Sequence, residues 1–285
     1  MTASFAGEGL LGTRVNPETP VISLVIPTFN ESANIEELLA RLTEALPAQA
    51  PCEVIFVDDS TDDTPAVISE AAGRSRLAVS VRHRDLPEGG LGGAVALGLR
   101  EASAPWIVVM DADLQHPPSL VPDLVTAGEQ AEADLVVATR YAGGGSRAGL
   151  DGGFRKFASG GSTALAKTVF PRRLRRVSDP MSGFFAVRAT SLDADVLRPL
   201  GYKILLELVV RCRLGRVTEV PYQFQDRFAG ESKANFGEGL RFLRHLMVLR
   251  ASSVSSALAR SVRPGRRTAP PPVPPVQENH PAETE

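Results

Sequence analysis

The sequence predicts an α/β fold in which a mostly parallel central sheet carries helices on both faces. Short apolar runs that read as strands alternate with segments of helical periodicity, and the connections between them are short. The run at 106–110 is apolar without alternation, as expected for a parallel strand that is covered on both faces. Acidic turns follow several of the strands, at the end of a parallel sheet where ligands usually bind.

In the first half of the chain, strands alternate regularly with helices after a flexible leader at 1–20. The expected strands cover 21–26, 54–57, 77–81 and 106–110. Three helices are expected. The first runs from Ser32 to about 46, the second follows the turn at 58–64 and ends at 68, and the third runs from a Gly-rich start at 89–93 to about 102. Because the strands are parallel, we expect the turns that follow them to meet at one edge of the sheet.

The second half completes a single domain that we place at 21–236. Its expected strands are 135–138, a strand that ends at 187, and 218–222; its expected helices are 154–170, 204–213 and 237–259. Six glycines at 142–153 predict a mobile loop. A Pro-rich tail at 263–285 is expected to be disordered.

Composition indicates an ordinary globular protein. The chain has 285 residues, 43% hydrophobic and 22% charged, with a net charge of −2, which indicates no general nucleic-acid partner. Cys52 and Cys212 lie far apart and fit a reducing compartment rather than a disulfide framework or a zinc site. Because neither a signal peptide nor a transmembrane segment is evident, we expect a cytoplasmic protein.

The charge is distributed unevenly. Residues 140–176 contain nine Lys or Arg and a single acid, which indicates either a solvated basic face or a site for a phosphate-bearing substrate. The expected C-terminal helix, 237–262, is amphipathic and basic: seven arginines and no acid lie between 240 and 267. It has an apolar stripe that includes Leu243 and Met247. The stripe could pack on the core of the domain or lie on an anionic membrane surface.

A metal site is predicted directly after the strand at 106–110. Asp111 and Asp113 are two residues apart, so on an extended segment their carboxylates would point the same way, and Gln115 would continue the row. Such oxygen ligands suit Mg²⁺ or Mn²⁺. The alternative is a surface turn in which Asp and Pro only end a strand.

Several other chemistries are not indicated. The sequence contains no nucleophile-elbow, Walker, zinc-protease or zinc-finger pattern. The stretch Gly90-Leu91-Gly92-Gly93-Ala94-Val95 carries only the first two glycines of a dinucleotide fingerprint, which makes a nicotinamide-dependent oxidoreductase a weak alternative. Two aspartates opposite basic residues fit the binding of a nucleoside diphosphate better.

Five motifs, in order along the chain, resemble those of the inverting GT-A glycosyltransferases of family 2. They are PTFNE at 27–31, VDDSTD at 57–62, DADLQHPP at 111–118, SDPMSGFF at 178–185 and GESK at 230–233. The third and fourth are similar to the polyprenyl (dolichyl) phosphate mannosyltransferase branch in particular. The resemblance covers roughly 21–250 and implies a GT-A domain that moves a hexose from a nucleotide sugar to a polyprenyl phosphate.

The resemblance also implies roles for individual residues. Asp111, Asp113 and Gln115 would bind the divalent metal. Arg140 and Arg155 would meet the lipid phosphate, which is itself an anion and needs no strong base. The residues expected to hold the nucleotide sugar are Pro27, Phe29, Glu31, Asp58, Asp59, Asp111, Lys203, Arg227 and Lys233. The residues expected to act in catalysis are Asp113, Arg140 and Arg155.

Some of these assignments have alternatives. Arg140 could be a structural arginine, and Lys203 could be an ordinary exposed lysine. His116 is expected to have a structural role, because its side chain should point away from that of Gln115. GDP-mannose is the expected donor, with UDP-glucose or another nucleotide sugar as the alternative; a non-catalytic scaffold that binds nucleotide sugars is the alternative from another class.

Three departures from the family pattern are evident. Gly160 stands where many relatives carry Arg, the residues after Lys233 differ from the common apolar one, and C-terminal transmembrane segments are absent. We therefore expect a peripheral protein on the cytoplasmic face of the plasma membrane. Its membrane contact would come from the basic helix or from a separate membrane-anchoring protein.

Overall fold

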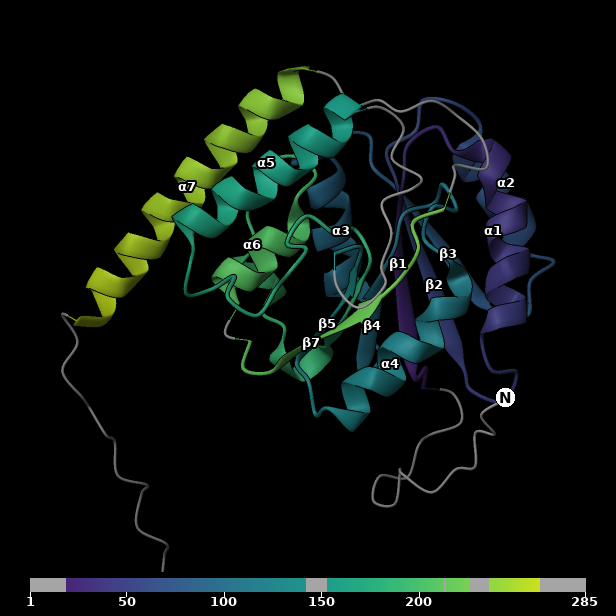
Figure 1. The fold of residues 1–285 in the computed structure, drawn as a ribbon. Helices are drawn as coiled ribbons and strands as arrows, with labels where there is room; N and C mark the ends of the chain where they lie inside the picture. Colours follow the sequence, from purple (N-terminus) through teal and green to yellow (C-terminus); the bar gives the residue numbers. More distant parts are fainter. Residues whose placement is uncertain (1–18, 142–152, 213, 226–235, 262–285) are drawn as a thin grey trace, which may run out of the picture.

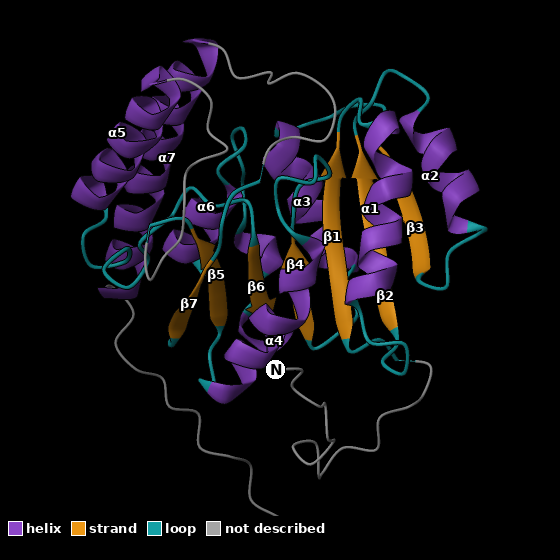
Figure 2. Ribbon diagram, turned by 45° about the vertical axis from the view of Figure 1, so that its right-hand side comes forward, coloured by secondary structure: helices purple, strands orange, loops and turns teal. Residues whose placement is uncertain are grey.

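The computed structural model describes residues 19–141, 153–212, 214–225 and 236–261, and its centre is one seven-stranded sheet (Figures 1 and 2). The strands lie in the order β3-β2-β1-β4-β6-β5-β7. They are β1 (Ile22–Thr28), β2 (Cys52–Asp58), β3 (Ala78–His83), β4 (Trp106–Val109), β5 (Leu135–Thr139), β6 (Phe185–Arg188) and β7 (Val217–Pro221). Only β6 runs antiparallel to its neighbours, so the predicted mostly parallel sheet is confirmed.

Helices cover both faces of this sheet, as predicted (Figure 2). The α-helices are α1 (Ser32–Ala45), α2 (Thr64–Ala72), α3 (Gly90–Glu101), α4 (Val121–Gln130), α5 (Gly153–Val169), α6 (Ile204–Arg211) and α7 (Phe236–Ser261). Short 3₁₀ helices lie at Pro118–Leu120, Ala189–Ser191 and Ala194–Val196. Most predicted elements are present within a few residues of their expected ends. Helix α4 was not predicted.

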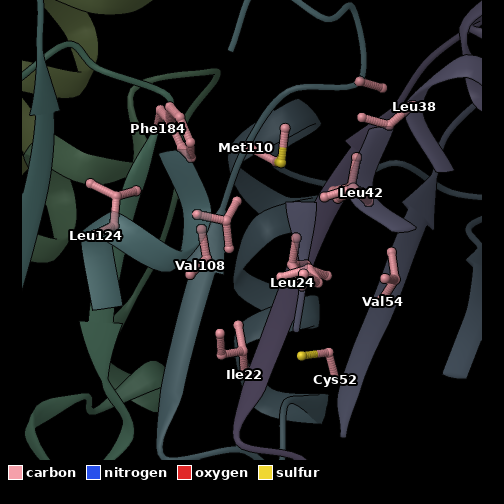
Figure 3. Packing of buried hydrophobic residues seen from close by; sticks show 14 of the residues in the cluster. Ile22, Leu24, Leu38, Leu42, Cys52, Val54, Val108, Met110, Leu124 and Phe184 are labelled. Atoms are coloured by element: carbon pink, nitrogen blue, oxygen red, sulfur yellow. The ribbon is translucent and has the colours of Figure 1, made fainter. Parts of the chain in front are cut away.

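Each face of the sheet has its own apolar core. On one face, side chains of β1, β2 and β4 pack against α1, α2 and α4; Leu24, Leu38, Met110 and Phe184 are among them (Figure 3). On the other face, Val25, Ile107 and Val109 pack with residues of α3, α5, α6 and α7. The central strands are therefore buried on both faces, which explains why their sequences are apolar without alternation.

The glycines at the start of α3 are required by packing. Gly92 N donates a 2.8 Å hydrogen bond to Gly201 O, and a Cβ on Gly92 would lie only 2.5 Å from that oxygen. Gly89 has a φ of +74° and receives a bond from Gly201 N. This contact with the loop before α6 explains why the stretch is rich in glycine, and no bound dinucleotide is needed to explain it. The reason for considering an oxidoreductase is thereby removed.

A buried polar cluster joins α7 to the core. Glu207 of α6 is fully buried and bonds Arg211 Nε at 2.7 Å and His245 Nε2 of α7 at 3.1 Å. Burial alone would raise the pKa of Glu207, but the bond from His245 and the bond from the Arg198 backbone lower it overall. Helix α7 is thereby fixed to α6 by charged hydrogen bonds as well as by apolar contacts.

Helix α7 has one packed side and one exposed side, and it lies beside α5 (Figures 1 and 2). Phe242, Leu246 and Leu249 are buried against the core, whereas Leu243 and Met247 are 44% and 67% exposed. One side of α7 therefore packs on the core, and the other side, with Leu243 and Met247, is the one that could lie on a membrane surface. Among the described residues, no helix is long and apolar enough to span a membrane.

Candidate functional site

The candidate site lies at the edge of the sheet where β1, β2 and β4 end. Strand β1 pairs in parallel with both of the others, and this register places Thr28 opposite Asp58. The backbone extends the pairing beyond the strands: Asp59 N donates to Thr28 O at 2.9 Å, and Met110 N donates to Val25 O at 3.2 Å. The turns after these strands are thus fixed to one another by backbone hydrogen bonds.

The turn that carries the metal motif is not extended as predicted. Strand β4 ends at Val109, and Leu114 adopts a φ of +62°, a left-handed conformation that breaks the alternation between Asp113 and Gln115. The turn is instead held by local bonds: Gln115 N donates to Asp113 Oδ1 at 3.1 Å. The prediction of one extended row is therefore wrong for Gln115.

The buried side chain of His116 stabilises this turn. Its Nδ1 accepts the backbone N–H of Asp111 at 3.0 Å, and its ring stacks on Phe184 with centroids 5.1 Å apart. Burial lowers the pKa of His116 to about 4, against the opposing charge of Asp113. The imidazole is neutral near pH 7 and is hydrogen bonded to the turn, which confirms the structural role expected for it.

The oxygen atoms that the turn offers as ligands fit a hard divalent metal ion. The Asp111 side chain is 37% exposed and Asp113 is 7% exposed. A Cβ on Gly183 would lie 3.0 Å from Asp111 Oδ2, so this glycine lets the chain pass close to the carboxylate. Gln115 Nε2 donates to Gln225 O, which orients the amide. No group of three or more His, Cys, Asp or Glu forms a metal site among the described residues, so water and phosphate would complete the coordination.

The residues expected at the nucleoside lie along β1 and β2. Pro27 is buried within β1, and Phe29 is 45% exposed just beyond it. Glu31 accepts a 2.5 Å bond from Asn34 Nδ2 at the start of α1. Asp59 forms a bidentate pair with Arg84, whose Nη2 lies 2.6 Å from Asp59 Oδ2.

Asp58 differs from these residues because its carboxylate is fully buried. It accepts hydrogen bonds from Thr28 Oγ1 at 2.7 Å and from Ser60 Oγ at 2.5 Å. Ser60 N and His83 Nδ1 complete the set, at 3.2 and 2.7 Å. A carboxylate has about four lone-pair sites, and here each meets a donor from the protein.

Arg140, at the end of β5, pairs with buried Asp179 of the SDPMSGFF motif. Its Nε and Nη2 lie 2.8 and 3.1 Å from the two carboxylate oxygens, and its Cζ lies 5.3 Å from the Phe224 ring centroid. Burial alone would lower the pKa of Arg140, but the bonds and charge of Asp179 raise it overall. Two N–H groups of Arg140 are thus used by the Asp179 carboxylate, and contact with a phosphate would use the other N–H groups.

The remaining predicted residues are less fully described. Lys203 is the residue before α6, and its Nζ lies 4.2 Å from the Tyr202 ring centroid. Arg155 belongs to α5, but its side chain lies outside the description. Arg227 and Lys233 lie outside the described residues, as does most of the Gly-rich loop predicted at 142–153.

Four residues at this edge were not assigned a role from the sequence: Arg84, His83, Asp179 and Tyr222. Asp179 lies in a motif that was singled out, so its involvement could have been proposed. His83 ends the edge strand β3 and Arg84 follows it, and neither lies in a motif. The Tyr222 hydroxyl is buried with no hydrogen-bond partner among the described residues, and burial raises the pKa of Tyr222.

A family model described as "Glycosyl transferase family 2" matches residues 23–192, which contain the Asp111 turn, Arg140 and the paired Asp179. The chain belongs to this family of glycosyltransferases, as the motifs implied.

Within the family, similar curated proteins include polyprenyl-phosphate mannosyltransferases. A dolichol-phosphate mannosyltransferase of Pyrococcus furiosus is 37% identical over 79% of this chain, which spans 62% of that relative's length. The enzyme of the same name from Saccharomyces cerevisiae is 35% identical, with 80% of this chain and 86% of its own covered. The undecaprenyl-phosphate mannosyltransferase of Micrococcus luteus is 33% identical, with 75% and 87% covered.

Solved structures share the fold. Glucosyl-3-phosphoglycerate synthase from Mycobacterium tuberculosis, in complex with UDP, superposes with a TM-score of 0.59 at 22% identity over 83% of this chain and 80% of its own. The same enzyme with Mn²⁺, UDP and glucosyl-3-phosphoglycerate gives a TM-score of 0.54 at 24% identity, over 86% and 81%. These likenesses confirm the GT-A fold.

The neutral state of His116 makes a prediction for stability. We expect the free energy of unfolding of the wild-type chain, relative to that of His116→Asn, to fall as the pH drops from about 6.5 to about 4. The folded pKa of about 4 lies below the ordinary 6.5, so the unfolded chain binds more protons in this window, and the difference is on the order of 3 kcal/mol. Asn can still accept the Asp111 N–H but cannot be protonated.

Urea unfolding at several pH values, without added divalent metal, measures this difference. Only its pH dependence matters, because Asn is smaller than His and lowers the stability at every pH. Parallel profiles for the two proteins would contradict the assignment of a buried neutral imidazole.

Proposed function

We propose that this protein transfers mannose from GDP-mannose to a polyprenyl phosphate, with inversion at the anomeric carbon. The observation that carries the proposal is the position of the Asp111–Asp113 turn, beside the ends of β1 and β2 and held by the motif that also binds Arg140. Carboxylates that could bind a metal ion with its diphosphate, and an arginine whose side chain is only 10% exposed, thus occur at one edge of the sheet. The names of the relatives support mannose and the polyprenyl phosphate.

The nucleoside side of the site would be formed by the turns after β1 and β2. Phe29 is 45% exposed, and a base can stack on an aromatic ring. The two turns are joined by Asn30, whose N donates to Ser60 Oγ at 2.8 Å and whose Oδ1 accepts from Thr61 N at 2.9 Å. Lys203, Arg227 and Lys233 would reach the donor from later segments of the chain, with Glu31 and Asp59 at the nucleoside.

Asp111, Asp113 and the amide oxygen of Gln115 would hold Mg²⁺ or Mn²⁺. When bound, such an ion neutralises the charge that develops on the departing diphosphate. The chain's own part is to keep both carboxylates fixed before the donor arrives. His116 does this for Asp111 through the backbone, and Gln115 N does it for Asp113.

The acceptor would supply the nucleophile. An oxygen of the lipid phosphate forms the bond to the anomeric carbon while the bond from that carbon to the diphosphate breaks, and the nucleoside diphosphate leaves. A phosphate monoester has its second pKa near 6, so it is already an anion at pH 7 and needs no general base. Arg140 and Arg155 would orient this phosphate.

Two alternatives would lead to different experimental results. Transfer of glucose from UDP-glucose, or of another sugar, uses the same arrangement of groups. A non-catalytic scaffold would bind the nucleotide sugar without turnover. The bidentate Arg140–Asp179 pair and the fixed carboxylates favour an enzyme, because a scaffold has no need for a charged acceptor site beside a metal site.

The first test of function is direct. We expect the protein to form a lipid-linked sugar from labelled GDP-mannose and polyprenyl phosphate with Mn²⁺ or Mg²⁺, and to lose activity in excess chelator. Asp113→Asn should lower kcat about a hundredfold or more, the usual cost of losing a group that stabilises transition-state charge. Asp123→Asn, the same change at an exposed site on α4, is the matched control and should leave kcat unchanged.

The measurement is radiolabel extracted with the lipid, in parallel with UDP-glucose. Product from UDP-glucose alone would favour the alternative donor, and binding without turnover would favour the scaffold. Full activity in excess chelator would contradict the metal assignment.

We also propose that the protein meets its lipid acceptor as a peripheral membrane protein, through the outer face of α5 and α7. This outer face presents exposed Leu165, Leu243, Met247 and Val248. Exposed arginines at 241, 244 and 250 accompany it, and residues 161–178 and 239–252 contain no acid. Apolar side chains with basic neighbours fit an anionic lipid surface. A separate membrane-anchoring protein is the alternative occupant.

Vesicle sedimentation tests this surface. We expect binding to phosphatidylcholine vesicles that contain anionic phosphatidylglycerol and little binding to neutral ones, with release at high salt, since screening shortens the attraction to about 8 Å near physiological ionic strength. Replacing Leu243 and Met247 together by Gln should weaken binding several-fold. Leu86→Gln, at a leucine 78% exposed on the β3–α3 loop, is the matched control.

These point changes suit the test better than removal of α7, because α7 also buries Phe242 and Leu246 against the core. Equal binding to neutral and anionic vesicles, or unchanged binding by the double variant, would contradict the proposed surface.

A further inference from the structure

Asp58 has no acceptor position left for a ligand. Its two oxygens bond Thr28 Oγ1, Ser60 Oγ, Ser60 N and His83 Nδ1, at 2.5 to 3.2 Å, and its side chain has no exposed surface. A nucleobase that approached it directly would have to displace one of these donors. The carboxylate at this position therefore serves the protein's own structure rather than offering a free acceptor.

His83 is the one partner of Asp58 that reaches solvent. It is the last residue of β3 and pairs in register with Asp58, and its side chain is 41% exposed, whereas Thr28 and Ser60 are buried. A carboxylate only accepts hydrogen bonds, so Nδ1 of His83 carries the proton in this 2.7 Å bond. In the neutral ring, Nε2 is then an acceptor on the exposed side of the imidazole.

The position of His83 fits the far end of a nucleotide whose phosphates lie at the Asp111 turn. Strand β3 is one of the two outer strands of the sheet, and β2 and β1 separate it from β4. Neighbouring strands lie about 4.8 Å apart, so the ends of β3 and β4 are separated by about 14 Å. Phe29 at the end of β1 lies between them in the strand order. A nucleoside diphosphate laid along this edge brings its base to the ends of β2 and β3.

We propose that His83 is a nucleobase-binding residue: its Nε2 accepts a hydrogen bond from a ring N–H of the donor's nucleobase, and Asp58 is the positioning residue that holds the ring in the required tautomer. Guanine, the base of the donor proposed above, presents such an N–H at N1. The inference rests on the proposed function for the identity of the base only. Uracil also has a ring N–H, so the role of His83 does not depend on which nucleotide binds.

The competing explanation is that His83 only satisfies the buried carboxylate of Asp58. Two substitutions separate these roles, because the Asn side-chain amide reaches the position of Nδ1 and the Gln amide reaches that of Nε2. His83→Asn can keep the bond to Asp58 but has no group at the base. His83→Gln gives up the bond to Asp58 but keeps an acceptor oxygen at the base.

The experiment is calorimetric titration of the full chain with GDP in the presence of Mn²⁺. We expect His83→Gln to bind within about threefold of wild type and His83→Asn to bind about tenfold more weakly, the size expected for one lost hydrogen bond. Titration with Mn²⁺ and pyrophosphate, which has no base, should give the same affinity for all three proteins. Thermal unfolding without nucleotide should show the reverse order, with Gln less stable than Asn.

Arg82→Ala is the matched control. Arg82 precedes His83 on β3, and successive side chains of a strand point to opposite faces of the sheet. The Arg82 side chain pairs with Glu101 of α3, so its loss should not change the affinity for GDP. If wild type binds UDP and not GDP, the donor proposed above is wrong and the same variants are compared with UDP. For the nucleotide that wild type binds, an Asn variant that binds as tightly as Gln, or more tightly, would overturn the role of His83.

Discussion

The site depends on β1 pairing in parallel with β2 on one side and with β4 on the other. Three strands that run side by side in the same direction must end at the same edge, and each of the three is followed by polar residues. The hydrogen bonds from Asp59 N to Thr28 O and from Met110 N to Val25 O continue the strand pairing into the turns that follow β2 and β4. Without this pairing, the Asp58 and Asp111 turns would have no fixed relation.

The SDPMSGFF motif plays the corresponding part on the other side of the site. Asp179 neutralises Arg140, Gly183 makes room for the Asp111 carboxylate, and Phe184 supports the His116 ring. One short segment before β6 thus touches the metal turn and the basic residue at the end of β5. Because β6 lies between β4 and β5, its antiparallel direction brings the start of the strand, and the motif with it, to the edge where they end.

Much of the fold was predictable from the sequence, because the periodicities that indicate strands and helices are local signals. The strands and most helices lie close to where the apolar patterns put them. Helix α4 was missed because Pro117 and Pro118, just before it, resemble a turn. Pro122 lies in the first turn of α4, where proline is acceptable. The left-handed Leu114 could not be predicted, because a leucine gives no sign of a positive φ.

The contacts between side chains at this edge could not be predicted from the sequence. Which side chain a carboxylate faces depends on strand order, and the sequence does not state that β3 lies beside β2. The pair Asp58–His83 joins the last residues of β2 and β3, and the pair Asp59–Arg84 joins the residues that follow them, so neither could be found from a motif. The Asp179–Arg140 pair joins residues 39 positions apart and depends on the same kind of information.

The measurement that tests the site most directly is a crystal structure with Mn²⁺ and GDP, in which the anomalous scattering of manganese locates the ion. We expect one manganese peak within bonding distance of the Asp111 and Asp113 carboxylates, at about 2.0–2.3 Å. The diphosphate should lie on this ion, and the base should extend toward the ends of β2 and β3. Manganese bound elsewhere in the chain, or a nucleotide away from this edge, would contradict the assignment of the site.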